Sequence, residues 1–396
     1  MNDDIERWLA ELSKGLETLR AADRRRGLRT VTPLPAHRIR SGDRVYMNLA
    51  SNDYLGLGCD VALHRAFARS LAAEDPLERI AFTASASRLL GGEHPAFETL
   101  ERLLGEVYGH GRRALLFGSG YHANIGILPA LVGREDLILS DRLVHASLVD
   151  GIRLCRAQSV RYRHNDMAHL SDLLAAKAHR ARRVFIVTES LFSMDGDLVE
   201  LRALVDLKRQ YGAVLYLDEA HAVGVRGPRG LGLAAEQGLI DDVDILLGTF
   251  GKALASAGAY AIVAPPVREH LVNTARSLIF TTALPPVMIR WAIFALRNAL
   301  EADERRARLG ECARVFRQAL GGDGVGTHIV PVVVGEDVVA GKLSLRLRER
   351  GYWVPPIRPP TVPEGTARLR FSLGADMNLE ALGELATETL RLRKEL

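Results

Sequence analysis

The chain has 396 residues, of which 47% are hydrophobic and 25% are charged. These are ordinary values for a globular protein, and the length exceeds that of a single hydrophobic core. The 52 basic and 48 acidic residues give a net charge of +4 without a long basic tract, which suits anionic metabolites better than nucleic acid. Cys59, Cys155 and Cys312 are far apart, so we expect neither a disulfide framework nor a metal site.

The amino terminus starts with acidic residues and has no apolar segment. No stretch approaches the roughly 18 uninterrupted apolar residues of a membrane span. We therefore expect a cytoplasmic protein without a targeting or membrane segment. Apolar residues from Ile5 to Leu19 recur at helical spacing and run into the basic stretch Arg24 to Arg26. This pattern predicts an amphipathic N-terminal helix.

From Val45 onward, apolar runs alternate with helical patterns. The runs predict strands over residues 114–117, 137–140, 183–188, 213–217 and 245–248. The intervening patterns predict helices that include residues 121–131, 144–154 and 200–211. Repeated βα units of this kind indicate an α/β fold with a mostly parallel sheet that is covered on both faces.

Pro285 and Pro286 interrupt this alternation. After them we expect a long helix over 287–320, a strand over 328–334, a helix over 337–350, a strand over 367–373 and a final helix from about Asn378. The predicted organisation is an N-terminal helical segment over 1–45, a large domain over 46–285 and a smaller α+β C-terminal domain over 286–396.

The side chains that could most readily take part in catalysis follow two predicted strands. Asp218-Glu219-Ala220-His221 follows one apolar run, and Thr249-Phe250-Gly251-Lys252 follows the next. Open α/β sheets bind ligands at this carboxyl edge. Pyridoxal phosphate (PLP) would use all these groups, because its aldehyde needs a lysine, its pyridine nitrogen an anion and its phosphate hydrogen-bond donors. The other five lysines occupy polar positions of helical patterns: Lys14, Lys177, Lys208, Lys342 and Lys394.

The segment Gly118-Ser119-Gly120-Tyr121-His122-Ala123 joins a predicted strand to a predicted helix. Backbone N–H groups at such a helix start can hold a phosphate. The segment also matches GxGxxA, and Asp141 follows about 20 residues later, as in dinucleotide-binding folds. A nicotinamide-dependent oxidoreductase is therefore an alternative, although it would leave Lys252 and Asp218 without a use.

Further candidates lie near other predicted strand ends and in a proline-rich segment. His145 follows the strand over 137–140, where it could stack on a planar cofactor or cap a helix. Glu189 and Ser193 follow the strand over 183–188 and add polar groups at the same edge. Arg358 stands between prolines, which would stiffen it as a bidentate clamp for a carboxylate.

Together these motifs resemble the α-oxoamine synthases, which are PLP enzymes of the aspartate-aminotransferase-like fold (fold type I). The resemblance covers nearly the whole chain. Ser51-Asn52-Asp53-Tyr54-Leu55-Gly56-Leu57 and Phe192-Ser193-Met194-Asp195-Gly196-Asp197 are specific to that family. The segment 357–370 most resembles its biotin-pathway branch.

The resemblance implies residue roles. Lys252 would form the Schiff base with PLP, Asp218 would pair with the pyridinium nitrogen, and His145 would stack on the ring. The remaining cofactor contacts would come from Gly120, Tyr121, Ser193, His221, Thr249 and, on a neighbouring subunit's phosphate, Thr281 and Thr282. Substrate would contact Arg26, Asn52, Arg358 and Thr361.

The activity that the resemblance implies is a decarboxylating condensation. L-Alanine and a pimeloyl thioester, carried by coenzyme A or a carrier protein, would give 8-amino-7-oxononanoate, CO2 and free thiol in a homodimer with shared active sites. Glycine with another acyl-CoA is an alternative, as is a non-catalytic phosphate-ligand-binding protein of this fold. The chain departs from the family at Ala84 and Ala86, in the segment 84–87, and at Ala255, where relatives usually have glycine. We therefore expect the 84–87 loop to follow a different path.

Overall fold

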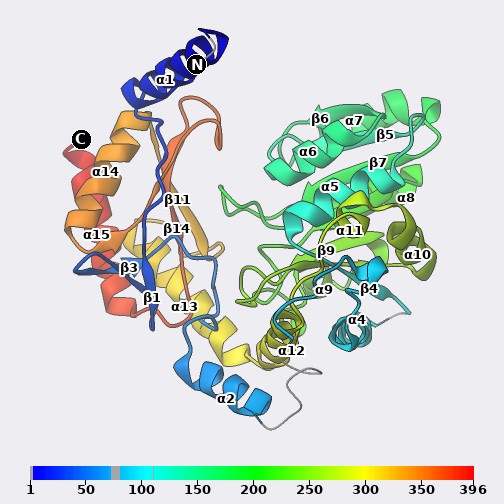
Figure 1. The fold of residues 1–396 in the computed structure, drawn as a ribbon. Helices are drawn as coiled ribbons and strands as arrows, with labels where there is room; N and C mark the ends of the chain where they lie inside the picture. Colours follow the sequence, from blue (N-terminus) through cyan, green and yellow to red (C-terminus); the bar gives the residue numbers. More distant parts are fainter. Residues whose placement is uncertain (1–2, 73–80, 110) are drawn as a thin grey trace. The chain divides into compact units, whose positions relative to one another are not determined.

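The computed structural model describes residues 3–72, 81–109 and 111–396. The chain divides into two compact units (Figure 1). The smaller comprises Met1–Ser51, Met194–Gly196 and Arg308–Leu396, and the larger comprises Asn52–Ser193 and Asp197–Ala307. This division by contacts does not coincide with the boundaries at 45/46 and 285/286, which stay a prediction.

The larger unit is built on a seven-stranded sheet, counted over the described residues, with strand order β4-β10-β9-β8-β7-β5-β6. Strand β10 is antiparallel to both of its neighbours, and the other pairs are parallel. The strands are β4 (Arg113–Phe117), β5 (Leu137–Asp141), β6 (Gln158–Tyr162), β7 (Val184–Glu189), β8 (Val214–Asp218), β9 (Ile245–Thr249) and β10 (Ala259–Val263). The five predicted strands of this region are confirmed, and so is the mostly parallel sheet.

Helices complete the larger unit. They are α2 (Val61–Ala72), α4 (Pro95–Tyr108), α5 (Gly120–Leu131), α6 (Ala146–Leu154), α7 (Met167–Lys177), α8 (Leu201–Tyr211), α9 (Leu233–Glu236), α10 (Pro265–Thr274), α11 (Arg276–Ile279) and α12 (Pro286–Leu300). Ile127 of α5 and Leu148 of α6 join Val187 of β7 and Leu247 of β9 in one buried apolar cluster. Burial of this face against the sheet fixes where the carboxyl ends of the parallel strands lie.

The smaller unit holds two further sheets, with orders β1-β2-β3-β12 and β11-β14-β13. Their strands are β1 (Thr32–Leu34), β2 (Arg38–Ser41), β3 (Arg44–Asn48), β11 (Ile329–Gly335), β12 (Tyr352–Trp353), β13 (Pro356–Ile357) and β14 (Ala367–Ser372). Its helices include α1 (Asp3–Ala21), α14 (Asp337–Glu349) and α15 (Leu379–Lys394). The predicted α+β character is confirmed. Among the described residues, every helix is too short or too polar to cross a bilayer.

The predicted helix over 287–320 is wrong, because two helices occupy this stretch. Helix α12 ends at Leu300, and α13 (Asp303–Ala319) begins three residues later. Arg306 of α13 donates from Nη1 to Ala299 O (2.6 Å) and from Nη2 to Leu300 O (3.3 Å). These bonds satisfy carbonyls that the end of a helix leaves open, and Asp303 favours a new helix start. The charged stretch is therefore a helix junction.

Candidate active site

Asp218 ends strand β8 and is 5% exposed. Its Oδ1 accepts a hydrogen bond from Ala220 N (2.9 Å), and its Oδ2 accepts one from Asn124 Nδ2 (3.0 Å). The Asn124 amide also donates to Ser147 Oγ (2.9 Å) and accepts from the Tyr216 hydroxyl (2.5 Å). Because the amide is satisfied on both sides, it holds the carboxylate in one orientation.

Lys252 lies in the turn that follows strand β9. The turn is closed by Gly251 N donating to Thr249 Oγ1 (3.1 Å) and by Ala255 N donating to Lys252 O (2.8 Å). Lys252 and Asp218 both influence the pKa of His145. Partial desolvation lowers the pKa of His145, the Asp218 carboxylate raises it, and the Lys252 ammonium lowers it. Lys252, Asp218 and His145 are therefore within electrostatic reach of one another, as the sequence predicted for one sheet edge.

His145 is the N-terminal cap of helix α6. Its Nδ1 lies 3.2 Å from the Ser147 backbone N–H and 2.7 Å from Ser147 Oγ, while its own backbone N–H donates to Glu189 Oε1 (2.5 Å). The cap fixes the ring, and the residue remains exposed. The two uses considered for this histidine are thus compatible, because a capping ring with an accessible surface can also stack on a planar ligand.

Glu189 ends strand β7 and is fully buried next to these groups. Burial and, to a smaller extent, the Asp218 carboxylate raise its pKa to about 8, although the Lys252 ammonium acts in the opposite direction. Near neutral pH this side chain is therefore a neutral carboxylic acid in the protein without ligand.

This shift predicts how the stability of the cofactor-free protein depends on pH. The folded state keeps a proton that the unfolded chain loses near its ordinary value of about 4.5, so the stabilisation from Glu189 disappears as pH rises from about 4.5 to about 8. In Glu189→Gln this pH-dependent loss of stability should be absent, because the amide mimics the neutral acid. Tm measured at pH 6 and pH 9 tests this. If Tm changed equally between pH 6 and pH 9 in the unmodified protein and in Glu189→Gln, the prediction would be contradicted.

His221 lies three residues beyond Asp218 and is 5% exposed. Its Nδ1 is 2.6 Å from the hydroxyl of Tyr54, and that hydroxyl is 3.0 Å from Asn52 Oδ1. A hydroxyl carries one proton, so if it donates to the amide oxygen it must accept from Nδ1–H. This arrangement places a proton on His221 Nδ1. It also joins His221 to the predicted substrate residue Asn52.

The start of helix α5 offers hydrogen-bond donors beside open space. Ser119 caps the helix, with Oγ accepting from His122 N (3.1 Å). The first backbone N–H groups, at Gly120 and Tyr121, have no partner within the helix by its geometry. A Cβ added to Gly120 would meet no atom within 4 Å. This predicted phosphate site therefore has both donors and room. The Tyr121 hydroxyl donates to Asp150 of α6.

The remaining predicted cofactor residues are one serine and three threonines in different parts of the larger unit. Thr249 Oγ1 donates to Gly258 O (3.1 Å) within the lysine turn. Ser193 follows β7 in the larger unit. Thr281 and Thr282 line a small cavity beside Gly118, at the end of β4. Contacts of these four residues with a cofactor, and of the threonines with a second subunit, stay predictions.

These residues fit pyridoxal phosphate on the chain's own geometry. A primary amine, an oriented buried carboxylate and an accessible imidazole lie near one another at the sheet edge. The same sheet carries a helix start with open donors. No group of three His, Cys, Asp or Glu side chains in the described part of the chain is placed to hold a metal ion.

Three predicted substrate residues lie together in the smaller unit. Arg26, Arg358 and Thr361 line a cavity of about 400 Å³. Arg26 Nη2 donates to Thr361 Oγ1 (3.0 Å). Arg24 instead pairs with Asp337 (2.6 Å) and Glu364 (3.1 Å). Of the basic stretch Arg24 to Arg26, Arg26 is therefore the residue bonded to another predicted substrate residue.

Comparison with known proteins places the chain in a family. A family model described as aminotransferase class I and II matches residues 44–388. The chain belongs to this family. It is 51% identical over 386 residues to the 8-amino-7-oxononanoate synthase of Chlorobaculum parvum, covering 96% of this chain and 98% of that protein.

Solved structures are also similar to this chain. Serine palmitoyltransferase from S. paucimobilis, with a bound PLP–myriocin aldimine, is 27% identical with a TM-score of 0.87, covering 98% of each chain. An 8-amino-7-oxononanoate synthase from Francisella tularensis is 27% identical with a TM-score of 0.73, covering 88% of this chain and 96% of that one. The predicted α-oxoamine synthase resemblance and fold are confirmed.

Membership of the family coexists with the two departures noted in the sequence. Ala255 has φ +46°, in the left-handed region that glycine adopts without a Cβ clash, so it costs about 1–2 kcal/mol of backbone strain. The chain therefore keeps a glycine-like conformation after the lysine turn. Ala84 and Ala86 have no positive φ, so neither stands where glycine would relieve strain, and the different path of the 84–87 loop stays a prediction.

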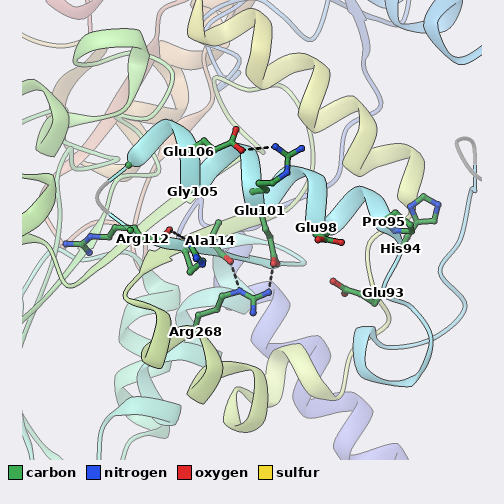
Figure 2. A pocket seen from close by; sticks show the side chains of 14 residues that line it. Glu93, His94, Pro95, Glu98, Glu101, Gly105, Glu106, Arg112, Ala114 and Arg268 are labelled. Carbon is green, nitrogen blue, oxygen red and sulfur yellow. Dashed lines mark hydrogen bonds and ion pairs between the residues drawn. The ribbon is translucent and has the colours of Figure 1, made fainter.

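A cavity of about 870 Å³ elsewhere in the larger unit holds none of the predicted site residues (Figure 2). Glu101 of α4 extends into it and binds Arg268 of α10 (2.6 Å), and Arg102 pairs with Glu106 (2.7 Å). Four of its lining charges thus form ion pairs with one another, and its lining contains no lysine. We therefore assign the active site to the sheet edge.

Proposed function

We propose that this member of the family catalyses the decarboxylating condensation of L-alanine with a pimeloyl thioester, giving 8-amino-7-oxononanoate, CO2 and free thiol. The observation that carries the proposal is the 51% identity, across 96% of the chain, to a protein named 8-amino-7-oxononanoate synthase. The sheet-edge residues that the sequence singled out agree with that chemistry.

Pyridoxal phosphate is the proposed cofactor, held by Lys252 at its aldehyde, by Asp218 at its pyridine nitrogen and by the start of α5 at its phosphate. When bound, it withdraws electrons from the α-carbon of the amino acid. Structures of serine palmitoyltransferase with bound PLP support this choice.

Different residues of the chain would tether the cofactor, transfer protons and stabilise charge. Lys252 tethers the cofactor and, once displaced by the amino acid, its amine removes the α-proton and later returns a proton to the product carbon. Asp218, oriented by Asn124, stabilises a positive charge on the pyridine nitrogen. His145 would stack on the ring, and His221 and Ser193 would contact the ring's phenolic oxygen. Asp218 is thus an electrostatic group and not a base.

Arg358 is the proposed clamp for a substrate carboxylate, with Arg26, Thr361 and Asn52 as further substrate contacts. In the structure Arg358 already binds a carboxylate of its own unit. Its Nη1 donates to Asp23 Oδ2 (2.9 Å) and to Asp23 O. Asp23 therefore competes with a substrate carboxylate for the same guanidinium.

This competition predicts that Asp23→Asn lowers KM for the amino acid. Exposed ion pairs contribute about 0.2–1 kcal/mol, so we expect KM to fall by about 1.4- to 5-fold with kcat unchanged. Asparagine suits the test, because Asp23 has φ +52° and asparagine tolerates that conformation. Glu364→Gln, which removes a neighbouring exposed partner of Arg24, is the control. A KM that is equal or higher in Asp23→Asn would contradict the prediction.

We further infer that the enzyme is a cytoplasmic homodimer. Support for the dimer comes from helix α1, whose apolar side chains are exposed in the single chain, including Trp8 at 56% and Leu16 at 51%. A continuous apolar face on an isolated helix favours a partner surface. Sedimentation equilibrium of the purified protein measures the mass directly.

The experiment that tests the reaction is a substrate panel. Purified protein loaded with PLP is mixed with alanine, glycine or serine and with pimeloyl, acetyl, succinyl or palmitoyl thioesters, and CO2 release is measured. Pimeloyl-CoA and a pimeloyl-carrier protein are compared side by side. We expect the alanine–pimeloyl pair to give the highest kcat/KM. A higher value for glycine or serine with another donor would assign the chain to a different branch of the family.

A further inference from the structure

His164 forms a charged cluster in the larger unit that the proposed chemistry does not use. It lies between β6 and α7, with Nδ1 at 3.0 and 3.1 Å from the two carboxylate oxygens of Asp141 and Nε2 at 2.9 Å from Asp197 Oδ2. Asp141 ends β5 and is completely buried. Since both ring nitrogens face carboxylates, both must donate, and the ring is an imidazolium.

The charge state agrees with this geometry. Burial alone would lower the pKa of His164, but its hydrogen bonds to Asp141 and Asp197 outweigh burial and raise it to about 10. A cation here is required by the environment, because a fully buried carboxylate without a positive partner carries a large desolvation cost. The cluster also engages both oxygens of Asp141, since Leu143 N donates to Oδ1 (2.8 Å). This use of Asp141 argues against a ribose contact and so against the dinucleotide alternative.

His164 contacts both arms of the turn that carries Ser193. The first arm contributes Phe192, whose ring meets the imidazole edge-on with centroids 4.5 Å apart. The second arm contributes Asp197. The arms are paired with each other, because Phe192 N donates to Asp197 O (3.0 Å) and Leu191 forms an antiparallel bridge with Leu198. We call residues 191–198 the Ser193 turn.

Asn165 strengthens the same attachment. Its backbone N–H donates to Asp141 Oδ2 (2.9 Å), and its Nδ2 donates to Asp197 Oδ2 (2.7 Å) and to Leu198 O (3.0 Å). The residue has φ +51°, a conformation that costs energy and persists where surrounding contacts determine it. Two consecutive residues thus tie the Ser193 turn to the end of β5. Strands β5, β6 and β7 run side by side in the larger unit (Figure 1).

We propose that His164 is a positioning residue that holds the Ser193 turn against the end of β5 and thereby sets the contact of Ser193 with the phenolic oxygen of the cofactor. The inference rests on the proposed function for the role of Ser193. The side chain suits the task, because an imidazolium presents two donors at opposite edges of one rigid ring. Glutamine has donors at one end only, and the flexible ammonium of lysine is not directed by a ring.

The first test measures the attachment without reference to activity. Hydrogen exchange of residues 190–198 is followed in the full-length chain with and without PLP, for the unmodified protein and for His164→Gln. Hydrogen bonds to charged groups are strong enough that we expect about 10- to 100-fold faster exchange in the variant. His270→Gln, an exposed histidine with one backbone bond to Ala130 O, is the control and should not change this segment. Unchanged exchange in His164→Gln would overturn the proposal.

The second test asks whether His164 acts through Ser193. The visible absorbance of bound PLP is titrated with pH, below pH 10, in His164→Gln, Ser193→Ala and the double variant. We expect both single variants to shift the titration midpoint in the same direction, and the double variant to shift it no further than Ser193→Ala alone. Fully additive shifts, or a normal midpoint in His164→Gln despite faster exchange, would reduce His164 to a structural residue. Failure of the unmodified chain to bind PLP would instead overturn the proposed function, and with it the cofactor role of the turn.

Discussion

Lys252→Ala is expected to lower kcat by at least about 10⁴-fold. One positioned proton-transfer group contributes about 10²–10⁴-fold, and this lysine also supplies the covalent tether, so the loss should reach or pass the upper end of that range. Borohydride should reduce PLP onto the unmodified protein at Lys252 and should leave no label in the variant. Both results come from steady-state kinetics and from peptide mass spectrometry of the reduced protein.

The control for Lys252 is Lys394→Ala. Lys394 is exposed at the end of α15, so its loss removes an amine without touching the sheet edge. It should retain full activity and the label at position 252. Stoichiometric label in Lys252→Ala, or label on another lysine of the unmodified protein, would contradict the assignment of the turn after β9 as the cofactor tether.

Much of the sheet could be predicted because its strands are buried on both faces and read as apolar runs, as in residues 184–187 of β7. Strand β10 has the same character, with all its residues buried, yet it was not predicted. Its pairing is antiparallel between β4 and β9, and a turn rather than a helix connects it to β9. The junction between α12 and α13 escaped prediction because the bonds from Arg306 that end the first helix depend on tertiary geometry.

In the active site, too, some residues could be predicted from the sequence and others could not. Asp218 and Lys252 could be predicted because ionisable side chains directly after buried strands have few structural uses. Asn124 and Tyr216 could not, since an amide within an apolar helix and a phenol within an apolar strand are common core residues. Their role becomes visible only when folding brings Asn124 against Asp218, 94 residues away in sequence. Tyr54 was noted within a motif, but its bond to His221 likewise needed the fold.

Asp218→Asn is expected to lower kcat by about 10²–10⁴-fold, the span of one preorganised electrostatic or acid–base group. The substitution keeps the volume of the side chain but removes the negative charge that stabilises a protonated pyridine nitrogen. It also places an amide N–H₂ where the carboxylate accepted from both Asn124 and Ala220, so one of these donors loses its acceptor. Cofactor affinity should therefore fall together with kcat. PLP titration and steady-state kinetics measure the two effects.

A matched control separates chemistry from stability. Asp136 is also buried, at 2% exposed, and it binds Arg182 and Arg183, whose guanidinium groups outweigh burial and lower its pKa to about 2. Asp136→Asn should lower Tm, because it removes a buried ionic partner, while leaving kcat and the absorbance of bound PLP unchanged. Asp218→Asn should change kcat and the absorbance far more than Tm. If the two variants lost activity only in proportion to Tm, the carboxylate of Asp218 would be a structural group, and the anion for the pyridine nitrogen would have to be sought elsewhere on the sheet edge.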